Sequence, residues 1–127
     1  MPETGQPFAN LMGVEILERD KTRVRARLTV REDLCTAGSI LHGGAFMAFA
    51  DALGGLAGAL NLAEGARTTT LESKTNFLGS ARLGDVVEGE TTPLHVGRRS
   101  SVWQTRITNA DGKLLCLVIQ TQMTIAA

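Results

Sequence analysis

The chain has 127 residues, a length that suits one domain with a single hydrophobic core. Its composition is that of an ordinary globular protein, with 43% hydrophobic and 20% charged residues. Basic and acidic residues number 13 each and there is no Tyr, so neither charge nor aromatic content favours a surface for nucleic acid or an anionic membrane. We therefore expect a single domain over residues 1–127, with no nucleic acid as partner and no insertion into a membrane.

The two cysteines, Cys35 and Cys116, form no CxxC motif and have no His or Cys nearby at a zinc-ligand spacing. We expect reduced core thiols and no metal site; a disulfide between the two is the alternative. The first seven residues contain neither the basic segment nor the apolar segment of a signal peptide. A cytoplasmic protein is the resulting prediction.

The N-terminal part of the chain reads as a short helix followed by a hairpin. Residues up to about Met12 suit a short helix or coil that covers another part of the molecule. Residues 14–18 and 23–30 are predicted strands, the second with strict alternation of apolar and charged residues. Asp20 and Lys21 lie where the hairpin turn is needed. Residues 31–41 have no periodicity and are predicted to form a loop.

An apolar run over residues 45–60 predicts a helix that ends near Asn61. The run is about long enough to cross a bilayer. However, Asp51 lies near its middle, and no Lys, Arg or Trp flanks it as an interfacial anchor. A helix buried on all sides by protein is therefore the favoured interpretation.

Four strands are predicted after this helix, at residues 67–78, 86–96, 100–109 and 113–125. Their connections are short, and residues 109–112 read Asn-Ala-Asp-Gly, a typical hairpin turn. Short connections predict antiparallel pairing. A curved sheet would bury one side of the helix, and a second copy of the chain would bury the rest. We expect an α+β hotdog fold, an antiparallel sheet of five to six strands wrapped around one long central helix, in a homodimer. The residues do not distinguish a dimer from a dimer-of-dimers tetramer.

The start of the helix, His42-Gly43-Gly44, is a candidate site for an oxyanion. The first N–H groups of a helix have no partner within it and lie at the positive end of its dipole. Glycine lets a substrate approach this backbone closely. Such a start could stabilise a carbonyl oxygen that gains charge during acyl transfer. The alternative is a tight turn in which His42 only caps the helix or packs in the core.

Asp51 is the second candidate, because an acid in apolar surroundings needs partners or a function. It is either a general base or nucleophile in a pocket, or a structural acid bonded to a neighbouring backbone or hydroxyl group in a helix that packs closely through its glycines. Gly43 lies eight residues before it, about 12 Å along a helix. Groups that act on one carbonyl must each lie within about 3 Å of the reacting atoms. If both serve one reaction, they come from two protomers.

Four segments of the chain, at residues 41–51, 76–85, 95–99 and 111–112, form a pattern that resembles the hotdog acyl-CoA thioesterases of the phenylacetate-degradation type. The resemblance runs from about Leu11 to Ile125. The most specific part is His-Gly-Gly followed by an acid at this spacing. The segments that carry it are Leu41-His-Gly-Gly-Ala-Phe-Met-Ala-Phe-Ala-Asp51, Asn76-Phe-Leu-Gly-Ser-Ala-Arg-Leu-Gly-Asp85, His95-Val-Gly-Arg-Arg99 and Asp111-Gly112.

This resemblance implies hydrolysis of an acyl-CoA thioester with no cofactor, CoA being part of the substrate. Asp51 would be the catalytic carboxylate, which either activates water or attacks the thioester. The Gly43 N–H would polarise the thioester carbonyl, and His42 would shape the site.

The sequence departs from this family at two positions. Members often carry a Ser or Thr near the water, but the position four after the acid is Gly55, so Thr70 on the following strand would have to take that role. Many members carry an Asn or Gln six residues before the His, where this chain has Thr36. The second contact to the carbonyl is therefore not transferred from the family.

The resemblance also implies cations for the phosphates of CoA around the strand turns. The forked, permanently charged side chain of Arg suits phosphate. A solvated turn is the alternative for the two adjacent arginines. The matching residues are Gly97, Arg98, Arg99, Ser100, Ser80 and Arg82.

Two other functions compete with the hydrolase. A hotdog dehydratase or hydratase would use a His with an acid, but Asp33 and His42 are loosely arranged for that role. A non-catalytic module that binds or senses acyl-CoA is the other alternative. The acyl group is not identified by the sequence. Several apolar residues could line an acyl pocket or belong to the core: Phe46, Met47, Phe49, Leu53, Phe8 and Leu11.

Overall fold

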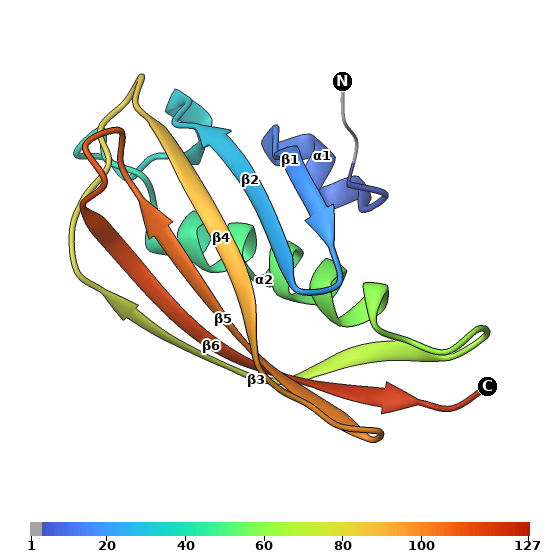
Figure 1. Ribbon diagram of the computed structural model, residues 1–127. Coiled ribbons are helices and arrows are strands. Elements are labelled where there is room, and N and C mark those ends of the chain that lie inside the picture. Colours follow the sequence, from blue (N-terminus) through green and yellow to red (C-terminus); the bar gives the residue numbers. More distant parts are fainter. Residues whose placement is uncertain (1–3) are drawn as a thin grey trace.

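The computed structural model describes residues 4–127 as one six-stranded antiparallel sheet that curves around a long helix (Figure 1). The strand order is β1-β2-β4-β5-β6-β3. The expected α+β hotdog fold is therefore confirmed, with six strands. In chain order the elements are α1 (Pro7–Met12), β1 (Glu15–Asp20), β2 (Arg23–Thr29), a 3-10 turn (Glu32–Leu34), α2 (Gly43–Leu60), β3 (Arg67–Phe77), β4 (Val86–Val96), β5 (Ser100–Thr108) and β6 (Leu114–Ile125).

Alternation in the strands decides which face of the sheet meets the helix. In β2, Val24, Ala26 and Leu28 are fully buried, and the arginines between them point away from the helix. Two of these arginines pair with acids on the neighbouring strands, Arg25 with Glu88 and Arg27 with Glu15. The predicted strand ends are confirmed to within two residues.

The helix α2 packs into the concave face of the sheet through Phe49 and Leu53, both fully buried. Gly89 in β4 makes this close approach possible, since a Cβ there would lie 2.7 Å from Leu53 Cδ1. The helix reaches a mean hydropathy of 1.3 over 18 residues, enough by length and composition to cross a membrane. Its packing against the sheet accounts for this apolar character.

One face of α2 stays open in the chain, so burial of the helix on all sides would need the second copy of the chain. Met47 is 39% exposed, and Asp51 and Ala59 on the same face are also exposed. The sheet covers only the opposite face, because its strands curve around one side of the helix (Figure 1). Burial of this open face by a second copy of the chain stays a prediction.

Strand β3 forms one edge of the sheet, and within residues 4–127 its only neighbouring strand is β6. Apolar side chains on and after this edge strand are exposed, at 59% for Leu71, 53% for Phe77 and 54% for Leu78. Long edge strands with exposed apolar residues readily pair with another chain.

Both cysteines are free thiols, as predicted. Cys116 is buried in β6, and this burial raises the pKa of its thiol to about 11. The Cys35 thiol lies 3.2 Å from the carbonyl oxygen of Arg31, to which it donates.

Candidate active site

His42 caps the start of α2 with its side chain. Its backbone is extended (φ −62°, ψ 140°), and its Nδ1 accepts from the Gly44 N–H at 2.8 Å. A Cβ on residue 44 would lie 3.0 Å from this Nδ1, so glycine leaves the room that the cap needs. Because Nδ1 is an acceptor, the neutral imidazole carries its proton on Nε2. The capping role considered for His42 is confirmed.

The cap leaves one donor free at the start of the helix. No acceptor among residues 4–127 receives the Gly43 N–H, which is the first N–H of the helix. This group lies at the positive end of the helix dipole. The Phe77 ring packs on the other side of this residue, 3.3 Å from where a Cβ would stand. The geometry therefore offers Gly43, and not Gly44, as a donor to a ligand.

Asp51 lies eight residues further along α2, on the open face of the helix, and its side chain is exposed in the chain. The expectation of apolar surroundings was wrong, because the neighbouring strands present polar side chains here. Asp51 Oδ1 accepts from Gln120 Nε2 at 2.8 Å and from Thr70 Oγ1 at 3.3 Å. The structure thus brings Thr70 to the acid, as predicted.

Two buried glutamines of β6 fill the space beside the glycines of α2. Gln120 and Gln122 are each 1% exposed. A Cβ on Gly54 would overlap the Gln120 amide, and one on Gly58 would lie 3.1 Å from Gln122 Cγ. Neither glutamine was predicted from the sequence as a contact of the glycines in α2. The available signal was the switch from apolar to amide side chains at the inward positions of this strand.

Two positions where the sequence departs from the family pattern have simple surroundings. The Thr36 hydroxyl accepts from the Gly38 N–H at 3.2 Å, within its own turn. At Gly55, a Cβ would meet no atom within 4 Å among residues 4–127 other than those of its own stretch of helix. The helix is thus open to solvent one turn after Asp51.

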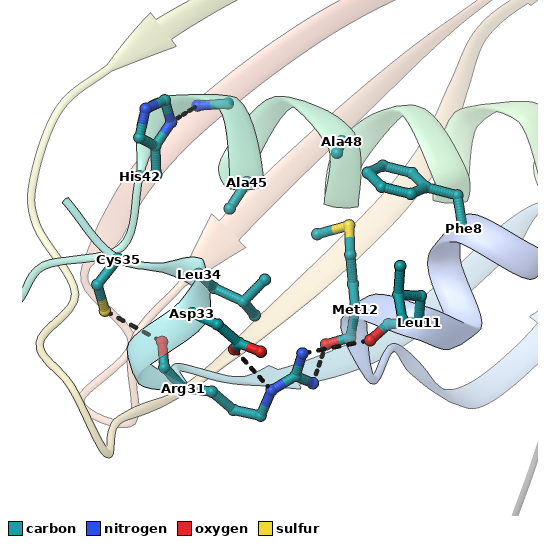
Figure 2. Close-up of a pocket in the computed structure, with 11 residues that line it drawn as sticks. Phe8, Leu11, Met12, Arg31, Asp33, Leu34, Cys35, His42, Ala45 and Ala48 are labelled. Carbon is teal, nitrogen blue, oxygen red and sulfur yellow. Dashed lines mark hydrogen bonds and ion pairs between the residues drawn. The ribbon is translucent and has the colours of Figure 1, made fainter.

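A cavity of about 400 Å³ lies between α1, the 3-10 turn and the start of α2 (Figure 2). Its wall is mostly apolar, and His42 stands at one end with Phe8 and Leu11 of α1 toward the other. The full lining is Phe8, Leu11, Met12, Arg31, Asp33, Leu34, Cys35, His42, Gly44, Ala45 and Ala48. Of the apolar residues considered for an acyl pocket, only Phe8 and Leu11 line this cavity. Phe46, Phe49 and Leu53 are core residues, and Met47 lies on the open helix face.

Arg31 fastens α1 to the rim of this cavity. Its guanidinium donates to the carbonyl oxygens of Met12 at 2.6 Å and Leu11 at 3.2 Å, at the C-terminal end of the helix, where a cation is favourable (Figure 2). It also pairs with Asp33 at 3.1 Å. Phe8 and Leu11 remain 63% and 72% exposed, so apolar surface next to the helix start stays accessible.

The residues proposed for CoA phosphates fall into two groups that one chain does not bring together. Gly97, Arg98 and Arg99 form the exposed turn after β4, which Ser100 of β5 follows, whereas Ser80 and Arg82 lie in the loop before β4. The 11 residues of β4 separate the two groups by about 33 Å, at about 3.3 Å per residue.

An antiparallel sheet curved around one helix, with a free N–H at the helix start and a carboxylate on its open face, defines a hotdog protein with the groups for acyl chemistry. The chain belongs to the thioesterase superfamily, whose family model matches residues 38–116. It is a thioester hydrolase of the hotdog fold.

Three similar proteins illustrate this membership. The solved structure of a thioesterase from Haemophilus influenzae has a TM-score of 0.87 and 32% identity, and the match covers 93% of this chain and 82% of that one. The 1,4-dihydroxy-2-naphthoyl-CoA hydrolase of Escherichia coli is 40% identical over 77 residues, which are 61% of this chain and 56% of that protein. The PaaI protein from the phenylacetic acid degradation operon of E. coli shares the fold, with a TM-score of 0.88 at 20% identity over 96% of this chain and 86% of that one.

Proposed function

We propose that the protein hydrolyses an acyl-CoA thioester to the free acid and CoA, with Asp51 as general base or nucleophile and the Gly43 N–H as oxyanion donor. The observation that carries the proposal is the pairing, on one helix, of a free N–H at the positive helix start with an exposed carboxylate held by neutral donors.

As a general base, Asp51 takes a proton from water while the water oxygen forms a bond to the thioester carbon. The carbonyl oxygen becomes an oxyanion, which the Gly43 N–H stabilises at the start of α2. The tetrahedral intermediate then expels the CoA thiolate with cleavage of the C–S bond, and the thiolate takes up the proton. As a nucleophile, the carboxylate would itself displace the thiolate, and water would hydrolyse the resulting anhydride.

The two groups belong to different protomers of a homodimer in this proposal. Along α2 they are about 12 Å apart, too far to act on the same carbonyl. The unpaired edge of β3 and the exposed side chains of Leu71 and Phe77 support pairing with a second copy at this edge. A two-fold axis would then build two sites, each with the acid of one chain and the donor of the other.

The same arrangement offers a way to hold CoA. One ligand can contact both Arg98 and Arg82 only if the two arginines come from different chains, because a whole strand separates them in one chain. The two adjacent arginines at the β4–β5 turn would then bind phosphate.

The acyl group in this proposal is apolar. The cavity beside His42 has about 400 Å³ and a mostly apolar wall next to the helix start. The E. coli relative is named for an aromatic acyl-CoA, which supports an aromatic acid as the substrate class.

Release of free thiol from a panel of aromatic, short-chain and long-chain acyl-CoA esters tests the function. We expect turnover, and we expect Asp51→Asn to reduce kcat by orders of magnitude with an unchanged melting temperature. Hydration of enoyl-CoA without thiol release would favour the hydratase alternative. Tight binding without turnover would favour the sensor. Near-wild-type hydrolysis by Asp51→Asn would remove this residue from the mechanism.

A further inference from the structure

A single buried amide connects the proposed catalytic acid to the sheet. The Gln120 side chain comes from β6 and is 1% exposed. Its Nε2 lies 2.8 Å from Asp51 Oδ1, 2.8 Å from Gln122 Oε1 and 3.2 Å from Thr70 Oγ1. Its two N–H groups are therefore directed at a carboxylate oxygen and at a second amide oxygen.

The orientation of this amide is fixed by its neighbours. A flipped Gln120 would bring Oε1 against the carboxylate oxygen of Asp51 and the Oε1 of Gln122, three acceptors with no hydrogen between them. The opposite oxygen, Gln120 Oε1, is buried and has no partner among residues 4–127. It lies where a Cβ on Gly54 would stand. A buried acceptor without a partner lowers the stability of the fold. The orientation of Gln120 that donates to Asp51 is therefore retained although it lowers stability.

A second layer holds Gln120 in turn. Gln122 Oε1 also accepts from the Thr70 hydroxyl at 2.6 Å, and Gln122 Nε2 donates to Thr68 Oγ1 at 3.0 Å. The Thr70 hydroxyl has one hydrogen, and its 2.6 Å contact with Gln122 is shorter than its 3.3 Å contact with Asp51, so Gln120 at 2.8 Å is the main donor to Asp51 Oδ1. The donors that face this acid are neutral, so they orient the carboxylate without neutralising its charge.

We infer that Gln120 is a positioning residue for hydrolysis: it holds Oδ1 of Asp51, so that Oδ2 is the oxygen that takes the proton from water or attacks the thioester. No donor among residues 4–127 reaches Oδ2. It lies on the open face of α2, where the partner and substrate would approach. This inference rests on the proposed function and adds to it the identity of the reacting oxygen and of the side chain that selects it.

The test compares Gln120→Met with Gln122→Met, two buried amides on one strand that differ in contact with Asp51. Met keeps the length of the side chain and removes the donor. Small misplacements of a reacting group lower rates by up to about 100-fold. We expect Gln120→Met to lower kcat by about 10- to 100-fold with KM within about 2-fold, and Gln122→Met to lower kcat by less than about 5-fold at a similar loss of melting temperature. Equal losses of kcat in the two variants, or an unchanged kcat in Gln120→Met, would overturn the inference.

Gln120→Glu gives a second readout that a purely structural role would not change. It places a carboxyl group in contact with Asp51, and two such groups do not readily ionise together. The acid limb of the pH–rate profile should therefore move to higher pH, and an unmoved limb would count against contact between residue 120 and the base. Asp51→Asn and the wild-type enzyme separate the possible failures. A wild-type protein that releases no thiol from any ester refutes the proposed function, and a fully active Asp51→Asn variant removes Asp51 from the mechanism. An inactive Asp51→Asn variant beside a fully active Gln120→Met variant refutes only the positioning role.

Discussion

Replacement of Gly43 by Pro tests the oxyanion donor with little other change. Proline is well tolerated at the first position of a helix, because the N–H that it lacks has no partner there. The preceding residue must be extended, and His42 already has ψ 140°. No hydrogen bond among residues 4–127 is lost, since the Gly43 N–H makes none.

Gly43→Ala is the matched control for this variant. Both substitutions add a Cβ that would stand 3.3 Å from Phe77 Cζ, but only proline removes the N–H. Loss of one oxyanion donor typically costs about 100- to 1,000-fold in kcat, or about 2.7 to 4 kcal/mol. We expect this loss for Gly43→Pro and a much smaller one for Gly43→Ala, at similar melting temperatures. If the two variants lose kcat equally, the Gly43 N–H is not the donor.

Mixed dimers then test which chain supplies the donor. Two differently tagged chains, one Asp51→Asn and one Gly43→Pro, can be co-expressed and the heterodimer purified through both tags. If the site is built from two chains, one of its two sites is intact, so about half of the wild-type kcat returns. If each chain holds a whole site, both sites carry a defect. Thiol release no faster than from either single-variant dimer would refute the shared site.

Three further predictions concern the substrate contacts and the helix packing. Replacing Arg98 and Arg99 by Gln should raise KM for CoA esters by about 10-fold and leave pantetheine thioesters unchanged, because only CoA carries the phosphates. Phe8→Ala should lower kcat/KM for aromatic esters by about 5- to 30-fold, the loss of about 1 to 2 kcal/mol of ring contact, and barely affect acetyl-CoA. Gly54→Ala should destabilise the fold by about 1 to 3 kcal/mol and lower kcat, because its methyl group would displace the Gln120 amide.

Each of these predictions has a clear contrary result. Equal KM changes for CoA and pantetheine esters would show that the two arginines do not bind phosphate. An equal effect of Phe8→Ala on aromatic and acetyl esters would exclude this ring from the acyl pocket. Denaturant unfolding of Gly54→Ala at wild-type stability would mean that the Gln120 amide moves aside at no cost.

Much of the fold could be predicted because its signals are local. The alternation in β2, the Asn109–Gly112 turn and the apolar run of α2 each determine their own element through spacing. The helix boundary at Asn61 follows from the glycine break after it. That the sheet covers only one side of α2 was also predicted, since six strands on one chain curve around one side of a helix.

The site was predicted in part: residues that lie close together in the sequence were found, and a contact between distant residues was missed. Asp51 and the helix start were found because they lie in one short segment with an unusual composition. Gln120 is 69 residues away from the acid that it contacts, and no local pattern joins them. Its burial depends on the register of β6 against β3 and on a glycine in another element. Long-range contacts of this kind need the assembled sheet.

The same geometry explains why the glycines of α2 occur where they do. Gly54 and Gly58 face β6, and each leaves room for one glutamine side chain, whereas Gly55 faces open space beside Asp51. Glycine inside a helix costs about 1 kcal/mol relative to alanine, so the first two are retained for packing against the amides. Gly55 has no such contact in the chain, which leaves substrate or the partner subunit as its neighbour in the assembly that we propose. Asp51 therefore contacts side chains of the sheet on one side, which orient its carboxylate, and is free to react with substrate on the other.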